Sequence, residues 1–216
     1  MSNKNHLLQP MLNISPVIPV LVIERTEDAL PIAQALLAGG LRVLEITLRT
    51  ANALEVIREI SINLPEAVVA AGTVTTPKQW HAAAQAGAQF VVSPGLTAPL
   101  AHEAAKAPVP LLPGVATASE LMTAADSGFE CFKLFPAQHV GGVGLLKSLH
   151  GPFPHAVFCP TGGITPDNAQ SYLALPNVAC VGGSWLAPGK LVQAQDWAGL
   201  TELARQAVAL KGVYSA

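Results

Sequence analysis

The feature of this sequence that points most directly to chemistry is a lysine inside the apolar run at 131–136, which reads CFKLFP. Burying the charged ammonium group of Lys133 would be costly, and desolvation favours the neutral amine. Two interpretations follow. Lys133 is a structural lysine paired with a carboxylate, either Glu130 or one across the core, or it is a catalytic amine that forms a Schiff base with a carbonyl substrate.

A second chemical feature is the run VLEITLR at 43–49. Strand alternation places Glu45, Thr47 and Arg49 on one face and the leucines and isoleucine on the other. If helices cover the apolar face, a carboxylate and a guanidinium point inward. A buried ion pair between Glu45 and Arg49 is the structural alternative to a catalytic carboxylate.

Polar groups also stand at the ends of other predicted strands. Thr73 ends the third and can donate a hydrogen bond to an anion, and Pro94 lies in a Ser-Pro-Gly turn after the fourth. The seventh strand runs into Thr161.

Glycines follow the seventh and eighth strands, at Gly162-Gly163 and at Gly182-Gly183-Ser184. Backbone N–H groups of such turns bind phosphate in many parallel barrels. A single glycine pair also marks an ordinary tight turn, so the signal comes from having two at these neighbouring strands.

The elements that must position these groups recur along the chain. Apolar, β-branched runs occur at 17–23, 42–48, 67–73, 90–93, 109–113, 131–135, 156–160 and 178–182. Helix start signals stand between them, as at Thr76, Thr117 and Thr165, and Asp28 is expected to cap the helix that contains Pro31. A longer amphipathic helix is expected at 196–210, after an N-terminal arm or helix at 1–15.

Eight strand–helix units predict one domain over residues 1–216 with a (β/α)8 barrel (TIM barrel) fold. An open doubly wound sheet fits the same alternation, but the first strand–helix turn lacks a dinucleotide-binding glycine fingerprint. In the barrel, Lys133 and Glu45 approach from opposite walls, with room for a small molecule between them. Cys131 and Phe135 share the face of Lys133 and would desolvate it.

Composition narrows the function classes. The chain is half hydrophobic, 12% charged and has a formal net charge of −2, which gives no basic surface for nucleic acid. We expect no membrane span, no signal peptide, and reduced core cysteines in a cytoplasmic protein. The histidines lack metal-ligand spacing, so no metal site and no cofactor are expected.

Six motifs together resemble the 2-keto-3-deoxy-6-phosphogluconate aldolase (KDPG/KHG aldolase) family, over about residue 16 to the C-terminal helix. They are VLEITLR (43–49), AGTV (71–74), SPGL (93–96), FKLFPA (132–137), CPTGGI (159–164) and GGSW (182–185).

The resemblance implies a class I, metal-independent aldolase that acts on small 2-keto acids, usually as a homotrimer. It would cleave the phosphorylated substrate to pyruvate and glyceraldehyde 3-phosphate, and the related reaction splits 4-hydroxy-2-oxoglutarate into pyruvate and glyoxylate. The implied roles are the Schiff base for Lys133, general acid/base catalysis for Glu45, pyruvate-carboxylate binding for Arg49 and Thr73, and the pocket and its stereoselectivity for Thr161, Phe135 and Pro94. Phosphate binding falls to Gly162, Gly163, Gly183 and Ser184.

Two departures from the family pattern and two alternatives remain. Leu134 stands where a second aromatic residue is common, and the loop Gln138-His139-Val140 replaces the usual Glu-Ala-Asn at the aldehyde end. A phosphate-binding barrel isomerase or epimerase would use Glu45 as a base and Lys133 as an electrostatic clamp. A non-catalytic sugar-acid-binding barrel would need no buried nucleophile.

Overall fold

The computed structural model describes residues 4–210, in which short parallel strands alternate with helices. Each strand except the fifth is followed by a helical segment, as the sequence predicts. The strands are β1 (Val17–Leu21), β2 (Val43–Thr47), β3 (Val68–Gly72), β4 (Phe90–Val92), β5 (Leu111–Leu112), β6 (Gly114–Val115), β7 (Cys131–Leu134), β8 (Val157–Pro160) and β9 (Val181–Gly183).

Three helices begin at the predicted N-caps. Thr76 accepts from the backbone N–H of Gln79, and Thr117 and Thr165 each form a capping box. The α-helices are α1 (Leu8–Leu12), α2 (Ala29–Ala38), α3 (Ala53–Asn63), α4 (Pro77–Gln85), α5 (Ala98–Glu103), α6 (Ala118–Asp126), α7 (Gly142–His150), α8 (Pro166–Leu173), α9 (Gly189–Gln193) and α10 (Trp197–Ala209). Short 3₁₀ segments are η1 (Lys4–Leu7), η2 (Thr26–Asp28) and η3 (Ala137–Val140).

Asp28 differs from its predicted role. It occupies the N-cap position of α2, but its side chain makes no capping hydrogen bond. The carboxylate instead accepts two hydrogen bonds from the Arg25 guanidinium, at 3.1 and 3.2 Å. A guanidinium is a stronger hydrogen-bond donor to a carboxylate than a backbone N–H, so Asp28 pairs with Arg25 instead of capping the helix.

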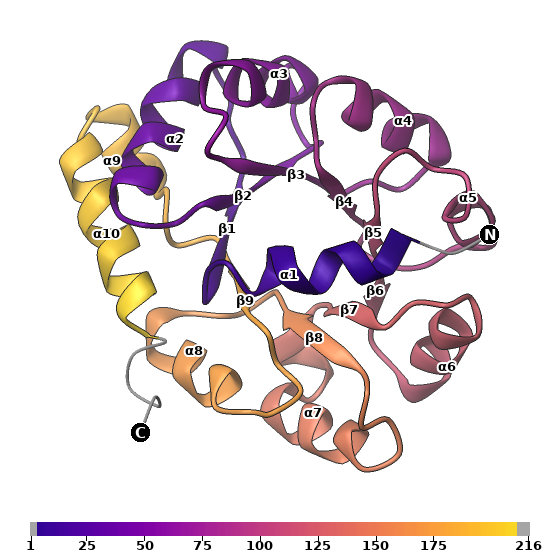
Figure 1. Cartoon of the computed structure of the whole chain (residues 1–216). Coiled ribbons are helices and arrows are strands. Elements are labelled where there is room, and N and C mark those ends of the chain that lie inside the picture. Colours follow the sequence, from indigo (N-terminus) through magenta and orange to yellow (C-terminus); the bar gives the residue numbers. More distant parts are fainter. Residues whose placement is uncertain (1–3, 211–216) are drawn as a thin grey trace.

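The strands pair in parallel in two sheets. One has the order β5-β4-β3-β2-β1-β9 and the other β6-β7-β8. Single bridges, Phe158 with Val178 and Thr161 with Gly182, link the β8 and β9 segments. Figure 1 shows the strands around a common centre with the helices outside them.

Of the predicted fifth strand at 109–113 only β5 is formed, and the second short strand, β6, lies beyond the predicted range. β5 pairs with β4, whereas β6 pairs with β7, and Pro113 lies between them. Proline has no N–H to donate to a strand ladder, so regular pairing stops there. The Pro113 carbonyl still accepts from Lys133 N at 2.8 Å, which ties the break to the strand that carries the lysine.

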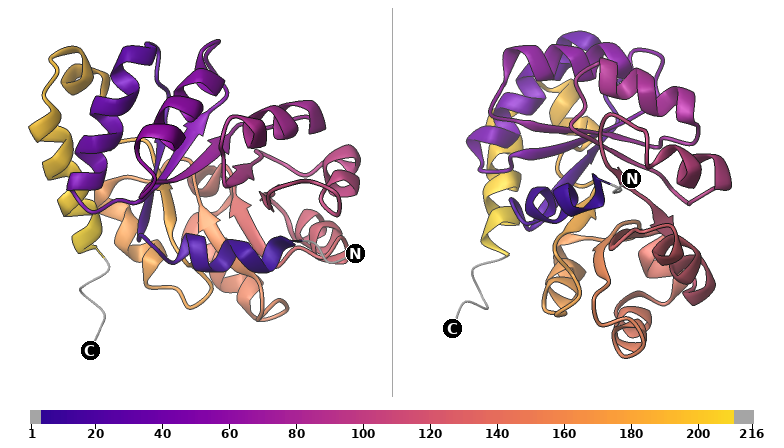
Figure 2. Two further views of the ribbon diagram at one scale, coloured as in Figure 1. Left: turned by 45° about the horizontal axis from the view of Figure 1, so that its top comes forward. Right: turned by 45° about the vertical axis from the view of Figure 1, so that its right-hand side comes forward.

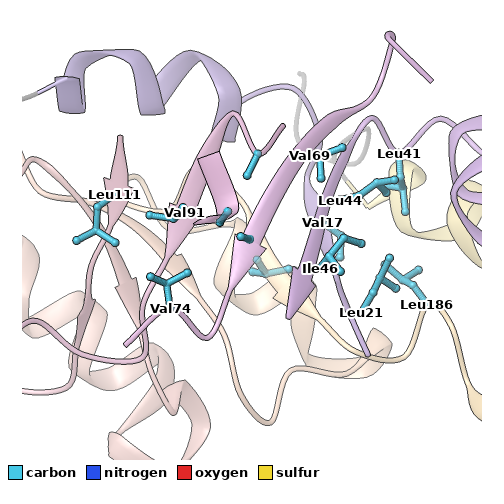
Figure 3. Packing of buried hydrophobic residues seen from close by; sticks show 14 of the residues in the cluster. Val17, Leu21, Leu41, Leu44, Ile46, Val69, Val74, Val91, Leu111 and Leu186 are labelled. Atoms are coloured by element: carbon cyan, nitrogen blue, oxygen red, sulfur yellow. The ribbon is translucent and has the colours of Figure 1, made fainter. Parts of the chain in front are cut away.

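Buried apolar side chains form an outer and an inner cluster. The outer cluster lies between strands and helices and includes Leu44 and Ile46, among the side chains drawn in Figure 3. The inner cluster includes Val43 together with Leu8 and Leu12 of α1. The period-2 prediction for β2 is therefore confirmed. The predicted N-terminal arm contains a helix, α1, that crosses the middle of the ring of strands formed by the two sheets (Figure 1).

The last helix, α10, closes the outer layer beside α2, as the views in Figures 1 and 2 show. Its N-cap Asp196 accepts from the N–H of Gly199 at 2.8 Å, close to the predicted start. No helix within residues 4–210 is long and apolar enough to cross a membrane. The cysteines at 131, 159 and 180 are buried, and no disulfide joins them in the described part of the chain.

Candidate active site

The candidate site is built around an ion pair between β7 and β2. Lys133 Nζ donates to Glu45 Oε1 at 3.2 Å, and both residues are only 4% exposed. Their strands belong to different sheets and stand on opposite sides of the ring in Figure 1. The predicted approach of the two side chains from opposite walls is confirmed.

The structural alternative of a buried pair between Glu45 and Arg49 is not found. The partner of Glu45 is Lys133, whereas Arg49 is exposed and turned toward Thr73. The predicted space between lysine and carboxylate is also not open, because the two side chains are long enough to meet across the ring. Of the two carboxylate partners considered for Lys133, the one across the core is found, whereas Glu130, just before β7, is exposed.

Gly72 makes room for the Glu45 carboxylate. A Cβ added at Gly72 would overlap Oε1 of Glu45 and lie 2.8 Å from its Cγ and Cδ. Gly72 sits beside Thr47 in the β2–β3 register, two residues beyond the Glu45–Ala70 pair, on the inward-facing side. In the sequence this glycine stands out only as part of the AGTV motif. An isolated glycine inside a strand, which often marks close approach of another group, was the available signal.

Arg49 and Thr73 are brought together beyond the ends of β2 and β3. Arg49 Nε donates to Thr73 Oγ1 at 3.1 Å. Thr73 has φ +60°, which is unusual for a β-branched residue and costs about 1–3 kcal/mol. Strain of this kind gathers at ligand-binding positions, and here it holds the hydroxyl within reach of a guanidinium at the carboxyl ends of the strands.

The surroundings of Lys133 are partly aromatic and partly sulfur. Its Nζ lies 5.4 Å from the centre of the Phe135 ring, so the predicted shared face is confirmed. Cys131, two residues before Lys133 on β7, lies in the inner cluster. Burial, with smaller contributions from Glu130 and Cys159, raises the pKa of the Cys131 thiol to about 12, so this thiol is neutral at physiological pH.

The β8 and β9 ends meet at Thr161. Thr161 is 6% exposed, and a Cβ on Gly182 would overlap its Oγ1. Gly162 and Gly163 follow with φ +98° and +76°, a backbone conformation that favours glycine. A Cβ on Gly162 would lie 3.4 Å from the Phe135 ring, so this turn adjoins the aromatic neighbour of Lys133.

Pro94 and Ser184 lie at the same end of the fold. The Pro94 carbonyl packs so closely on Gly114 that a Cβ there would overlap it, and Gly114 is the register neighbour of Lys133. Ser184 is exposed and lines a cavity of about 640 Å³ bounded by β1, α2 and α9. Neither Lys133 nor Glu45 lines this cavity.

Within residues 4–210, no three His, Cys, Asp or Glu side chains are grouped closely enough to hold a metal ion. The charged groups of the candidate site are the buried Lys133–Glu45 pair and the exposed Arg49, which follows β2 and contacts Thr73. Such a set offers an amine, a carboxylate and a guanidinium, which suit carbonyl attack, proton transfer and carboxylate binding.

Comparison with known proteins places the chain among the aldolases. A family model described as KDPG and KHG aldolase matches residues 8–203. The KHG/KDPG aldolase of Escherichia coli (strain K12) is 50% identical over 208 residues, which cover 96% of this chain and 98% of that protein. The chain belongs to the KDPG and KHG aldolase family.

Two solved structures show the same fold. The KDPG aldolase of Legionella pneumophila, with pyruvate captured as a covalent carbinolamine intermediate, has a TM-score of 0.91 at 48% identity and covers 93% of this chain and 97% of its own. The Zymomonas mobilis ZM4 aldolase with 3-phosphoglycerate has a TM-score of 0.90 at 50% identity, with coverage of 96% and 97%. These matches do not support the isomerase alternative.

Proposed function

We propose that this protein is a class I aldolase that cleaves 2-dehydro-3-deoxy-6-phosphogluconate to pyruvate and glyceraldehyde 3-phosphate, with 4-hydroxy-2-oxoglutarate as a second substrate. The observation that carries the proposal is the buried amine of Lys133, 3.2 Å from the Glu45 carboxylate. Capture of pyruvate as a carbinolamine in the Legionella relative supports amine attack on the ketone.

The proposed reaction uses the chain's own side chains for each step. Lys133 gives a proton to Glu45, and the resulting neutral amine attacks the C2 ketone. Glu45 returns the proton to the departing hydroxyl, so that loss of water gives an iminium and restores the carboxylate. Glu45, directly or through one water, takes the proton of the C4 hydroxyl while the C3–C4 bond breaks. The electron pair of that bond forms an enamine, which is protonated at C3 and hydrolysed to release pyruvate and the free amine.

Binding positions the ketone for this sequence. Arg49 holds the pyruvate carboxylate through two parallel hydrogen bonds and Thr73 adds a hydroxyl, which fixes C2 over the amine. Substrate entry separates Lys133 from Glu45, because the pair fills the space that the ketone must occupy. Thr161, Phe135 and Pro94 form the pocket wall that governs C4 stereochemistry.

The phosphate end is assigned to two backbone turns. Gly162, Gly163, Gly183 and Ser184 provide N–H donors and a hydroxyl at the carboxyl ends of β8 and β9. The 3-phosphoglycerate bound by the Zymomonas relative supports recognition of a phosphorylated three-carbon acid or aldehyde in this family.

Fold closure, assembly and location complete the proposal. The two sheets act as one single-domain (β/α)8 barrel, supported by the β8–β9 bridges and by chain continuity through Pro113. The resemblance supports a homotrimer, which light scattering on the purified protein tests. The buried thiols fit a reducing cytoplasm.

Borohydride trapping tests the chemistry. Incubation with pyruvate and borohydride should attach one reduced pyruvate to the peptide that carries Lys133. Lys133→Arg should abolish the adduct, because arginine keeps the charge but forms no imine. Lys190→Arg, at an exposed position, is the matched control and should label normally. Labelling that survives Lys133→Arg would refute the assignment.

A further inference from the structure

The segment after β7 lies directly against the glycine turn after β8. Ala137 N donates to Thr161 O at 2.8 Å, and Gln138 N donates to Gly162 O at 3.0 Å. A Cβ on Gly163 would lie 2.5 Å from the Cβ of Gln138. The position of Gln138 therefore decides where the Gly162–Gly163 turn can sit.

Hydrogen bonds hold the backbone carbonyl groups of the Gly162–Gly163 turn and leave its N–H groups without a partner in the described residues. The carbonyl of Gly162 accepts from Gln138 N, and the carbonyl of Gly163 accepts from Asn168 Nδ2 at 3.0 Å. Among the residues that the structure describes, no acceptor takes the N–H of Gly162 or Gly163. Both carbonyls are thus held by the protein, and both N–H donors are left for a ligand.

The side chain of Gln138 is fixed from behind the turn. Tyr172 Oη donates to Gln138 Oε1 at 2.7 Å, and Tyr172, on α8, is only 1% exposed. Burial raises the pKa of the Tyr172 hydroxyl, which therefore remains a donor at neutral pH. Gly142 leaves room for this hydroxyl, because a Cβ there would lie 2.8 Å from it.

We infer that Gln138 and Tyr172 are positioning residues that hold the Gly162–Gly163 turn with its N–H groups directed at the phosphate, and so set the preference for phosphorylated over unphosphorylated substrate. The inference rests on the proposed function. Their bond joins η3, which follows the strand that carries Lys133, to α8 behind the turn, so it fixes the distance between the amine end and the phosphate end of the site. Pyruvate needs only the amine end.

Steady-state kinetics on matched variants test this role. Gln138→Leu removes the acceptor and Tyr172→Phe removes the donor, and each leaves a side chain of similar size. Each should raise KM for the phosphorylated substrate about 5-fold or more, the usual effect of losing a buried hydrogen bond. KM for 4-hydroxy-2-oxoglutarate and pyruvate trapping should stay at the wild-type values. The double variant should be no worse than either single variant, because both remove the same bond.

One further variant separates positioning from general destabilisation. Thr201→Val removes a hydroxyl that donates to Ala35 O at 3.0 Å between α10 and α2, and should lower stability without changing that ratio.

Two outcomes would overturn the inference: an unchanged KM ratio in Gln138→Leu and Tyr172→Phe, or the same ratio change in Thr201→Val. Failure of the wild-type protein to trap pyruvate would instead refute the proposed function.

Discussion

Replacing Gly72 by alanine tests whether the Glu45 carboxylate must lie where the structure has it. The backbone of Gly72 is not in the left-handed region, so alanine is allowed there and the effect comes from the added methyl group alone. That methyl carbon would lie 2.8 Å from Cδ of Glu45, whereas carbon atoms normally pack at about 3.5–4.0 Å. Glu45 must therefore shift by about 0.7 Å or more from the position in which it contacts Lys133.

The structure sets the size of the expected effects. Inserting a methyl group into a packed site costs roughly 1–3 kcal/mol of unfolding free energy. A displacement near 1 Å in a catalytic arrangement costs about 10²-fold in rate. We therefore expect Gly72→Ala to fold and to lose about 1–3 kcal/mol of unfolding free energy. It should cleave substrate about 10²-fold more slowly.

The assay compares pyruvate release, pyruvate trapping and urea unfolding with those of Gly144→Ala. Gly144 lies in α7 with nothing within 4 Å of an added Cβ, so the same chemical change there should leave turnover intact and add about 0.5–1 kcal/mol of stability. In a Glu45→Ala background the clash has no partner, and Gly72→Ala should cost much less than it does alone. Turnover within about twofold of wild type would refute the reasoning, because a displaced catalytic group costs much more than that. Stability losses of Gly72→Ala and Glu45→Ala that add in full would also refute it.

Three further predictions concern separate groups. Glu45→Gln should lower cleavage about 10²–10⁴-fold while pyruvate trapping remains detectable, and near-normal cleavage would leave the carboxylate a structural role. Ser184→Asp should raise KM for the phosphorylated substrate by charge repulsion, with Ser119→Asp on α6 as control, and an equal rise for 4-hydroxy-2-oxoglutarate would contradict a phosphate site. Because burial raises the pKa of Cys131 from 9.0 to about 12, the unfolded thiol ionises first, so stability should fall between pH 9 and 12. Urea unfolding at stepped pH should show a shallower fall for Cys131→Ala, and identical slopes would contradict burial of the thiol.

Local chemistry explains why most of the fold was predictable. Apolar runs of strand length, threonine N-caps and glycines with positive φ at Gly40, Gly87 and Gly128 each act within a few residues of themselves. The predictions that failed concern residues whose structure depends on a competing partner or on neighbouring strands. Asp28 binds Arg25 instead of capping α2, and Pro113 separates β5 from β6 where the neighbouring strands change.

The candidate site was predictable in its residue types and less so in its distances. Strand alternation placed Lys133 and Glu45 on the inner face, but whether they touch depends on the curvature of the two sheets, which alternation does not encode. The hydrogen bond between Gln138 and Tyr172 joins residues 34 positions apart, and no local pattern marks it. Gly72 acts on a side chain of another strand, so its role also required the structure.

The Lys133–Glu45 pair is difficult to explain as a device for stability. Removing two charges from water costs several kcal/mol per ion, and replacing a buried ion pair by apolar side chains is often neutral or stabilising. The chain already fills the other end of the ring in that way, because Leu8 and Leu12 pack with Val43 and Cys131 in the inner cluster. The interior is thus apolar beside α1 and charged towards the carboxyl ends of the strands. Parallel α/β proteins keep their chemistry at those carboxyl ends, which is where a costly pair of charges is retained for function.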